Sequence, residues 1–259
     1  MRKRRRPSAP VTARSLALFR LGEVCNNNCP MCSNSGRPEG WYTATEALLQ
    51  RLDFVYGQGV RRVILTGGEP TIHRGFWPVV ARIGELAMAW DINTHGRTFA
   101  DPTFARRALE AGLERAIISL HSHIAAASCV VSGFEPRHHE QTIAGIDQLV
   151  ASGAEVMLNC VLCRPNLDHL GAYLDWCVAR WGADISLKFA FPTTIGRGGG
   201  WEAIQLRYGE VQDTIRALHQ AGQQGGVKVI FESVPNCVLG DAEASDLSRS
   251  GFGETHYLD

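Results

Sequence analysis

Residues 25–32 read Cys-Asn-Asn-Asn-Cys-Pro-Met-Cys, the most informative motif in this sequence. It places three thiols in one short loop. A structural zinc site has four protein ligands in a closed tetrahedron, and an ordinary four-iron cluster has four thiolates. Three thiolates leave one coordination position open, where an iron can bind and activate a small molecule. We therefore predict Cys25, Cys29 and Cys32 as metal ligands.

Outside this loop the chain alternates apolar strand-like runs with amphipathic helical segments. Such alternation predicts a parallel sheet with right-handed crossovers. The expected strands cover roughly residues 16–24, 62–66, 90–94, 116–121, 155–162, 184–191 and 227–231. The first expected helix ends near residue 57, and the others cover roughly residues 77–87, 102–111, 140–151, 167–181 and 208–221. A capping box at residues 43–46 is expected to open the first helix.

Polar residues recur at every second position near the carboxyl ends of the expected strands. They are Asn93, His95, Ser119, His121, Asn159, Ser186 and Lys188. A period of two gives each strand one polar and one apolar face. In a barrel with outer helices the polar face would line the upper lumen, where barrel enzymes place their sites. The pattern favours a partial (β/α)6-type TIM-like barrel with parallel strands and outer helices over a flat doubly wound α/β sheet.

A second motif, Gly-Gly-Glu-Pro at residues 67–70, follows the second expected strand. Together with the cysteine loop and the β/α alternation it resembles the radical S-adenosylmethionine (radical SAM) superfamily, over about residues 16–237. The resemblance implies a [4Fe–4S] cluster on the three cysteines, with S-adenosylmethionine bound to the fourth iron. It further implies reductive cleavage of S-adenosylmethionine to a 5′-deoxyadenosyl radical, which abstracts hydrogen from a peptide or small-molecule substrate that the sequence does not identify.

The resemblance also assigns roles to individual residues. The implied S-adenosylmethionine contacts are Met31, Gly67, Gly68, Glu69, Pro70, Asn93, His95, Ser119, His121 and Asn159. The catalytic candidates are Glu69, whose carboxylate would bind the methionine ammonium, and Lys188. Met31 stands where relatives more often have an aromatic residue, and His95 where a second Asn is frequent. The arginine that many relatives carry after the fourth strand is missing, so Arg137 and Lys188 are the candidates for the cofactor's carboxylate.

Composition narrows the possible partners and compartment. Lys plus Arg and Asp plus Glu both number 26, so the zero net charge does not favour a nucleic-acid or anionic-membrane partner. The basic run at residues 2–6 is expected to be a solvated tail rather than an export signal, and no segment has the length of a transmembrane helix. We expect a cytoplasmic protein with a disordered tail at 1–14, the barrel at 15–240, and a tail at 241–259 without a cysteine-rich extension. A reducing donor of the flavodoxin or ferredoxin type is the expected protein partner.

Other features have simpler readings beside a functional one. Cys160 and Cys163 are spaced C-x-x-C, but they lie on an expected strand whose positions three apart face opposite sides, so buried free thiols are favoured. The loop histidines at 121, 123, 138 and 139 suggest a second metal only weakly. The glycine-rich segment 196–200 is expected to be a mobile loop over the substrate. Lys188 can instead lie along the barrel wall with its ammonium in solvent.

Two other function classes remain open from the sequence. An iron–sulfur electron carrier or redox sensor would use the same cysteines, but it gains nothing from an open iron or from a carboxylate such as Glu69. A zinc-stabilised binding module would need a histidine or a distant cysteine as the fourth ligand.

Overall fold

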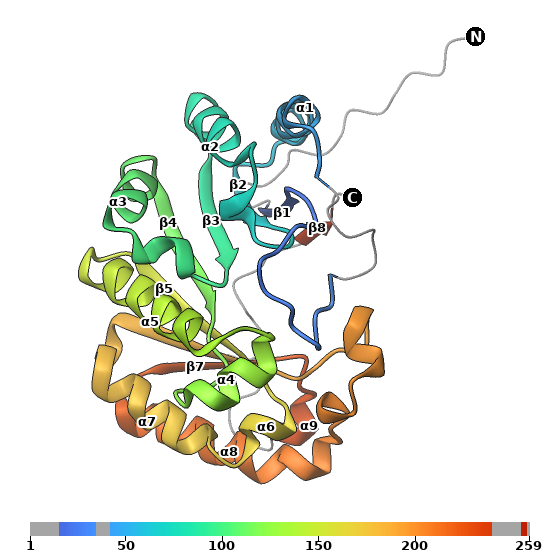
Figure 1. Cartoon of the computed structure of the whole chain (residues 1–259), viewed down its shortest axis with the longest axis vertical. Helices are drawn as coiled ribbons and strands as arrows, with labels where there is room; N and C mark the ends of the chain where they lie inside the picture. The colour runs from blue at the N-terminus through green and yellow to red at the C-terminus, as the bar shows by residue number, and fades with distance from the viewer. Residues whose placement is uncertain (1–15, 35–41, 240–254, 258–259) are drawn as a thin grey trace.

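The structure is a computed structural model that describes residues 16–34, 42–239 and 255–257. Its strands form one sheet with the order β7-β6-β5-β4-β3-β2-β1-β8, in which all paired neighbours are parallel. The strands are β1 (Leu16–Arg20), β2 (Arg62–Thr66), β3 (Ala89–Thr94), β4 (Leu113–Ser119), β5 (Glu155–Val161), β6 (Ile185–Ala190), β7 (Lys228–Glu232) and β8 (Thr255–Tyr257). The two edge strands do not pair with each other, so the sheet is an open, partial barrel (Figure 1).

Helices cover the outer side of the curved sheet (Figure 1). The α-helices are α1 (Thr45–Gly57), α2 (Phe76–Glu85), α3 (Pro102–Glu110), α4 (Ala125–Ser132), α5 (Pro136–Ala151), α6 (Arg164–Leu167), α7 (Leu170–Trp181), α8 (Tyr208–Gly225) and α9 (Asn236–Leu239). The 3-10 segments are η1 (Pro70–Ile72), η2 (Arg97–Ala100), η3 (Gly182–Asp184), η4 (Gly196–Gly200) and η5 (Glu202–Ile204). None of the described helices is both long and apolar enough to cross a membrane.

The two faces of the strands follow the predicted period of two. Outward-facing side chains such as Phe19, Leu65 and Ile118 join the main core beneath the helices. Inward-facing side chains form a separate, smaller apolar layer across the barrel, made of Leu16, Leu18, Ile64, Ile117, Met157 and Ile230. The polar positions nearer the carboxyl ends therefore lie above an apolar floor, which supports the upper cavity and separates it from the amino ends of the strands.

Charged residues lie at the amino-terminal side of this layer. The carboxylate of Asp91 is fully buried and accepts hydrogen bonds from Arg62 Nη1 at 2.8 Å and from Arg115 Nη2 at 2.9 Å. Both arginines are partly exposed, so one buried anion holds the cations of two neighbouring strands. Removing one partner of a buried ion pair is strongly destabilising because the other charge is left uncompensated.

We expect Asp91→Ala to lower the free energy of unfolding by about 2–3 kcal/mol, less than for a fully buried pair because the freed guanidinium groups reach water. Glu155→Ala is the matched control: it removes the exposed carboxylate 3.6 Å from Arg115 Nη1, and should change stability by less than about 1 kcal/mol. Urea unfolding of the two variants checks this, and equal losses would contradict the role given to the buried carboxylate.

Several expected boundaries are corrected by the structure. The capping box at 43–46 is wrong: α1 begins at Thr45 after Ala44, no side chain caps it, and the hydroxyl of Thr43 is buried without a hydrogen-bond partner. The first strand ends at Arg20, and the expected loop before residue 140 contains α4 and the start of α5. Strand β8, which the sequence did not predict, pairs with β1. The predicted tail at 1–14 and most of that at 241–259 lie outside the described residues.

Candidate active site

The cluster loop, defined as residues 25–32, leaves the carboxyl end of β1 and lies against the second motif. The backbone N–H groups of Gly68 and Glu69 donate to the carbonyls of Gly22 and Val24, each at 2.8 Å. A Cβ built on Gly68 would lie 2.2 Å from the Val24 carbonyl oxygen, and one on Gly67 would lie 2.3 Å from that of Gly22. The two glycines are needed because only a residue without a side chain permits this close approach. The Gly-Gly-Glu motif thereby fixes where the cluster loop begins.

The other side of the cluster loop is held from two later connections. The backbone N–H of Arg197, in the glycine-rich segment 196–200, donates to the Cys32 carbonyl at 3.0 Å. Gly133, which ends α4 with φ of 60°, approaches Asn28 so closely that a Cβ there would lie 2.0 Å from the Asn28 carbonyl oxygen. Segment 196–200, expected to be a mobile loop over the substrate, forms a 3-10 turn that packs on the cluster loop and places Arg197 at the cavity described below; its mobility stays a prediction.

Gly133→Ala should displace the cluster loop, because the new methyl group overlaps backbone rather than a flexible side chain, and because its φ is left-handed. We expect a several-fold lower iron content after reconstitution. Gly153→Ala is the control, because it has the same left-handed backbone strain but open space around the added Cβ. It therefore shows the effect of the strain without the steric clash. Equal iron contents in the two variants would show that the contact with Asn28 does not shape the loop.

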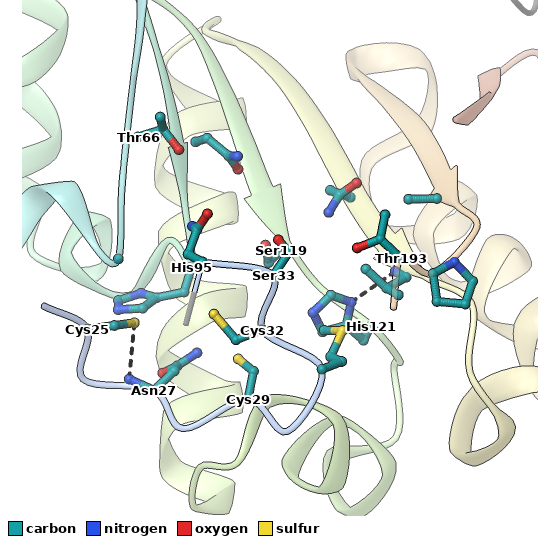
Figure 2. A pocket seen from close by; sticks show the side chains of 18 of the residues that line it. Cys25, Asn27, Cys29, Cys32, Ser33, Thr66, His95, Ser119, His121 and Thr193 are labelled. Carbon is teal, nitrogen blue, oxygen red and sulfur yellow. Dashed lines mark hydrogen bonds between the residues drawn. The ribbon is translucent and has the colours of Figure 1, made fainter. Parts of the chain in front are cut away.

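The three thiols converge on the inner side of the cluster loop (Figure 2). Burial, to which the charges of the neighbouring cysteines add, raises the pKa of the Cys25 thiol to about 11 and that of Cys29 to about 12. Thiolates are the metal-binding form, so metal binding here must release protons. No group of three His, Cys, Asp or Glu side chains in the described part of the chain is arranged to hold one ion. A four-iron cluster suits such spacing, because each thiolate binds a different iron.

Glu69 lies next to the cluster loop with its carboxylate buried in a shell of donors. Oε1 accepts from Thr71 N at 3.1 Å, from Thr71 Oγ1 at 2.6 Å and from Thr94 Oγ1 at 2.8 Å. Oε2 accepts from His95 N at 2.9 Å. These bonds fix the orientation of the carboxylate, and Oε2 keeps acceptor capacity for a further donor. Because Glu69 also lines the cavity described next, its charge is presented to a ligand rather than neutralised by a protein cation.

A cavity of about 580 Å³ opens at the carboxyl ends of the strands, within the size range of small-molecule sites. The sequence-predicted residues that line it are Cys25, Cys29, Met31, Cys32, Gly67, Gly68, Glu69, Asn93, His95, Ser119, His121, Asn159 and Lys188. Two predicted residues lie elsewhere: Pro70 is buried at the start of η1, and Ser186 faces a second, lower cavity. Arg137 is exposed, pairs with Glu135 and does not line the cavity, so of the two cations predicted for the cofactor's carboxylate only Lys188 lines it; Arg197, which was not predicted, lines it as well.

Pairing register explains why residues from distant parts of the chain meet in this cavity. Ser119, Asn159 and Lys188 occupy adjacent positions on β4, β5 and β6. Asn159 Oδ1 is buried and has no hydrogen-bond partner in the structure. Buried polar atoms are rarely left unpaired, so this oxygen fits a donor such as a hydroxyl of a bound ligand. Together, Asn159 and the free acceptor capacity of Glu69 fit the ribose and ammonium groups of S-adenosylmethionine.

Two further cavity residues have well-defined partners. His121 is fully buried, which lowers its pKa to about 4, so the ring is neutral near pH 7. Its Nδ1 accepts from Val161 N at 3.1 Å (Figure 2). Its carbonyl accepts from Asn166 Nδ2 at 2.9 Å. The ammonium of Lys188 pairs with Glu232 at the end of β7, so the alternative of a lysine directed only to solvent is wrong. Lys188 and Glu232 bring paired opposite charges to the β6–β7 side of the cavity.

Sequence reasoning missed several residues of the site. Thr71 and Thr94 orient Glu69, Gly133 shapes the cluster loop, and Glu232 pairs with Lys188. Only Glu232 carried a usable signal, since it is a charged residue at the end of an apolar strand. The contacts of the other three depend on connections that the sequence pattern does not specify. Cys160 and Cys163 are both buried free thiols, as predicted, but only Cys160 lies on β5; Cys163 lies beyond the strand end and caps α6.

Comparison with known proteins identifies the family. The profile of the Radical SAM superfamily matches residues 19–177, more than half of the chain. The chain belongs to the radical SAM superfamily. Enzymes of this superfamily use a [4Fe–4S] cluster and S-adenosylmethionine. The matched region contains the cluster loop, the Gly-Gly-Glu motif and Asn159, whereas the cavity residues from Lys188 onward lie beyond it.

Individual relatives of this radical SAM chain differ in what they act on. A probable GTP 3′,8-cyclase of Pyrococcus abyssi is 31% identical over 156 residues, which are 60% of this chain and 49% of that protein. SuiB of Streptococcus suis bound to S-adenosylmethionine has a TM-score of 0.68 at 14% identity, covering 88% of this chain and 52% of SuiB. The protein anSMEcpe with bound AdoMet has a TM-score of 0.67 at 14% identity, covering 83% and 61%. These structures share the fold, and the chain spans about half the length of the curated relative.

Proposed function

We propose that this protein is a radical SAM enzyme that cleaves S-adenosylmethionine reductively and abstracts hydrogen from a substrate held in the same cavity. The observation that carries the proposal is that the three thiols and the Glu69 carboxylate face one cavity at the carboxyl ends of the strands. The two cofactors supply an electron, a labile carbon–sulfur bond and the 5′-deoxyadenosyl radical. The protein supplies their positions and excludes water.

Each part of the cavity has a proposed task. Cys25, Cys29 and Cys32 hold the cluster, and Glu69 binds the methionine ammonium through a charge-assisted hydrogen bond. Asn159 Oδ1 accepts from the ribose, beside Asn93 and Ser119. Met31, His95 and His121 complete the wall around the nucleoside. Lys188 faces the substrate from β6, where its ammonium can bind an anionic group in exchange for Glu232.

A non-enzymatic electron carrier explains less of the structure. An outer-sphere carrier needs no cavity beside its cluster and no buried carboxylate with spare acceptor capacity. The proposed enzyme needs both, together with a one-electron donor of the flavodoxin or ferredoxin type and a reducing compartment such as the cytoplasm. The names of the relatives include a nucleotide cyclase and a peptide-bound protein. The proposed substrate is therefore either a peptide or a small molecule.

Asn159→Leu tests the proposed nucleoside position. The substitution removes the unpaired acceptor and keeps a side chain that branches at Cγ, so we expect about 3- to 10-fold weaker S-adenosylmethionine binding, the value of one neutral hydrogen bond. Equilibrium dialysis on cluster-loaded protein measures it. Asn27→Leu, on the cluster loop, is a poor control because it changes the loop itself, so Gln212→Leu on the outer helix α8 is preferred. Unchanged affinity in Asn159→Leu would remove this residue from the binding site.

A further inference from the structure

Arg97 is a buried cation directly behind the cluster loop. It begins η2, immediately after β3, and only 8% of the residue is exposed. Its Nη2 donates to the backbone carbonyl of Asn26 at 2.9 Å, and its buried Nε has no hydrogen-bond partner. No carboxylate among the described residues forms an ion pair with it. A buried charge is strongly unfavourable unless it is paired, and no described carboxylate is bonded directly to Arg97, so a negative group on the cluster loop would stabilise it.

Most of the negative groups whose charge acts on the Arg97 guanidinium belong to the metal site. Burial lowers the pKa of Arg97, while Cys25, Glu69 and Cys29 act in the opposite direction and Arg137 adds to the lowering. Two of the three opposing groups are predicted cluster ligands. Arg97 does not line the cavity, whereas His95, two residues earlier, does. Its guanidinium is therefore placed toward the loop that holds the cluster rather than toward the space for S-adenosylmethionine.

His95 holds the cluster loop at the same residue, Asn26. Its Nδ1 accepts from the backbone N–H of Arg97 at 3.2 Å, so in the neutral ring Nε2 carries the proton and donates to Asn26 Oδ1 at 2.7 Å. Asn26 is thus held twice, through its side chain by His95 and through its carbonyl by Arg97. The segment that follows β3 fixes the loop between the first two cysteines, and His95 N also bonds Glu69 Oε2.

We propose that Arg97 is a positioning residue that supplies the counter-charge of the cluster and favours its reduced form, an inference that rests on the proposed function. Reduction adds one electron from an external donor to a cluster that already carries three thiolates, and no bond is made or broken. A fixed positive charge close to the cluster lowers the energy of the added negative charge. Because Arg97 itself is buried, salt should screen its charge less than that of a surface arginine.

The experiment compares Arg97→Gln and Arg97→Lys with the native protein. Glutamine keeps a donor for Asn26 but no charge, and lysine keeps the charge. After anaerobic reconstitution, iron and sulfide per chain are measured, and the cluster is titrated with dithionite in the absence of S-adenosylmethionine. In Arg97→Gln we expect the ratio of reduced to oxidised cluster at a fixed potential to fall at least tenfold, a shift of about 59 mV to more negative potential for one electron. Arg97→Lys should stay close to the native value, and so should Arg106→Gln, which removes an exposed arginine from α3.

Several results would overturn the inference. A native potential in Arg97→Gln with a full cluster would show that the charge has no electrostatic role, and weaker S-adenosylmethionine binding in that case would assign the arginine to the cofactor's carboxylate. Loss of the cluster in Arg97→Gln and Arg97→Lys alike would leave only a packing role. Because the titration contains no S-adenosylmethionine, the shift can be observed even if the protein forms no 5′-deoxyadenosine, so failure of the proposed function is recognised separately.

Discussion

Cys29→Ala should abolish cluster binding. The substitution leaves two thiolates in the loop, and no other described Cys, His, Asp or Glu forms a metal-binding group with them. A four-iron cluster held at three corners by protein loses an iron ligand that water does not replace well. We expect near-complete loss of iron and sulfide from anaerobically reconstituted protein, while the fold survives because Cys29 is outside both main apolar clusters.

Cys237→Ala is the matched control for this prediction, because Cys237 is an exposed thiol on α9. It should load the cluster as the native protein does. Iron and acid-labile sulfide analysis, with circular dichroism to confirm folding, makes the comparison. Full loading of Cys29→Ala would contradict the assignment of the three ligands, and stoichiometric zinc in the native protein with no sulfide would favour the zinc-stabilised module.

Glu69→Gln should weaken S-adenosylmethionine binding by ~10- to ~150-fold, the equivalent of a charge-assisted hydrogen bond of ~1.5–3 kcal/mol. The substitution also disturbs the site itself. An amide NH₂ at the Oε1 position would face the N–H of Thr71, and at the Oε2 position it would face the N–H of His95. Either orientation sets the NH₂ against a backbone N–H, so the side chain cannot keep all of the native hydrogen bonds.

The control for Glu69→Gln is Glu23→Gln. Glu23 also lines the cavity, but its carboxylate is already paired with Arg20 at 2.8 Å. Equilibrium dialysis with cluster-loaded protein should show a much smaller loss of affinity for the control. Native affinity in Glu69→Gln, with the cluster intact, would remove Glu69 from the binding site and favour the electron-carrier alternative.

The sequence predicted the sheet and most of the cavity because both depend on strong local patterns. The strand alternation at Asn93, Ser119 and Asn159 follows from a fixed geometric period, and parallel pairing then brings these positions to one opening. The cysteine motif and the Gly-Gly-Glu-Pro motif indicated which loops surround this opening. The cavity residues predicted in this way come from six different strands or the connections that follow them, β1 to β6.

The residues that sequence reasoning missed act through connections rather than periodic elements. Gly133 and Arg197 contact the cluster loop from segments more than 100 positions away, and their spacing has no pattern to detect. Arg97 reads in sequence as an ordinary charged residue after a strand, and only the structure shows that it is buried without a carboxylate partner. Side-chain burial of charge is decided by tertiary packing, which composition and periodicity do not specify.

The central claim is that this cavity cleaves S-adenosylmethionine reductively. The most direct measurement is mass spectrometry of anaerobically reconstituted protein after reduction with dithionite and addition of S-adenosylmethionine. We expect the native protein and Cys237→Ala to form 5′-deoxyadenosine and methionine in equal amounts. Cys29→Ala should form neither. A fully loaded, reduced cluster that neither binds S-adenosylmethionine nor forms 5′-deoxyadenosine would contradict it.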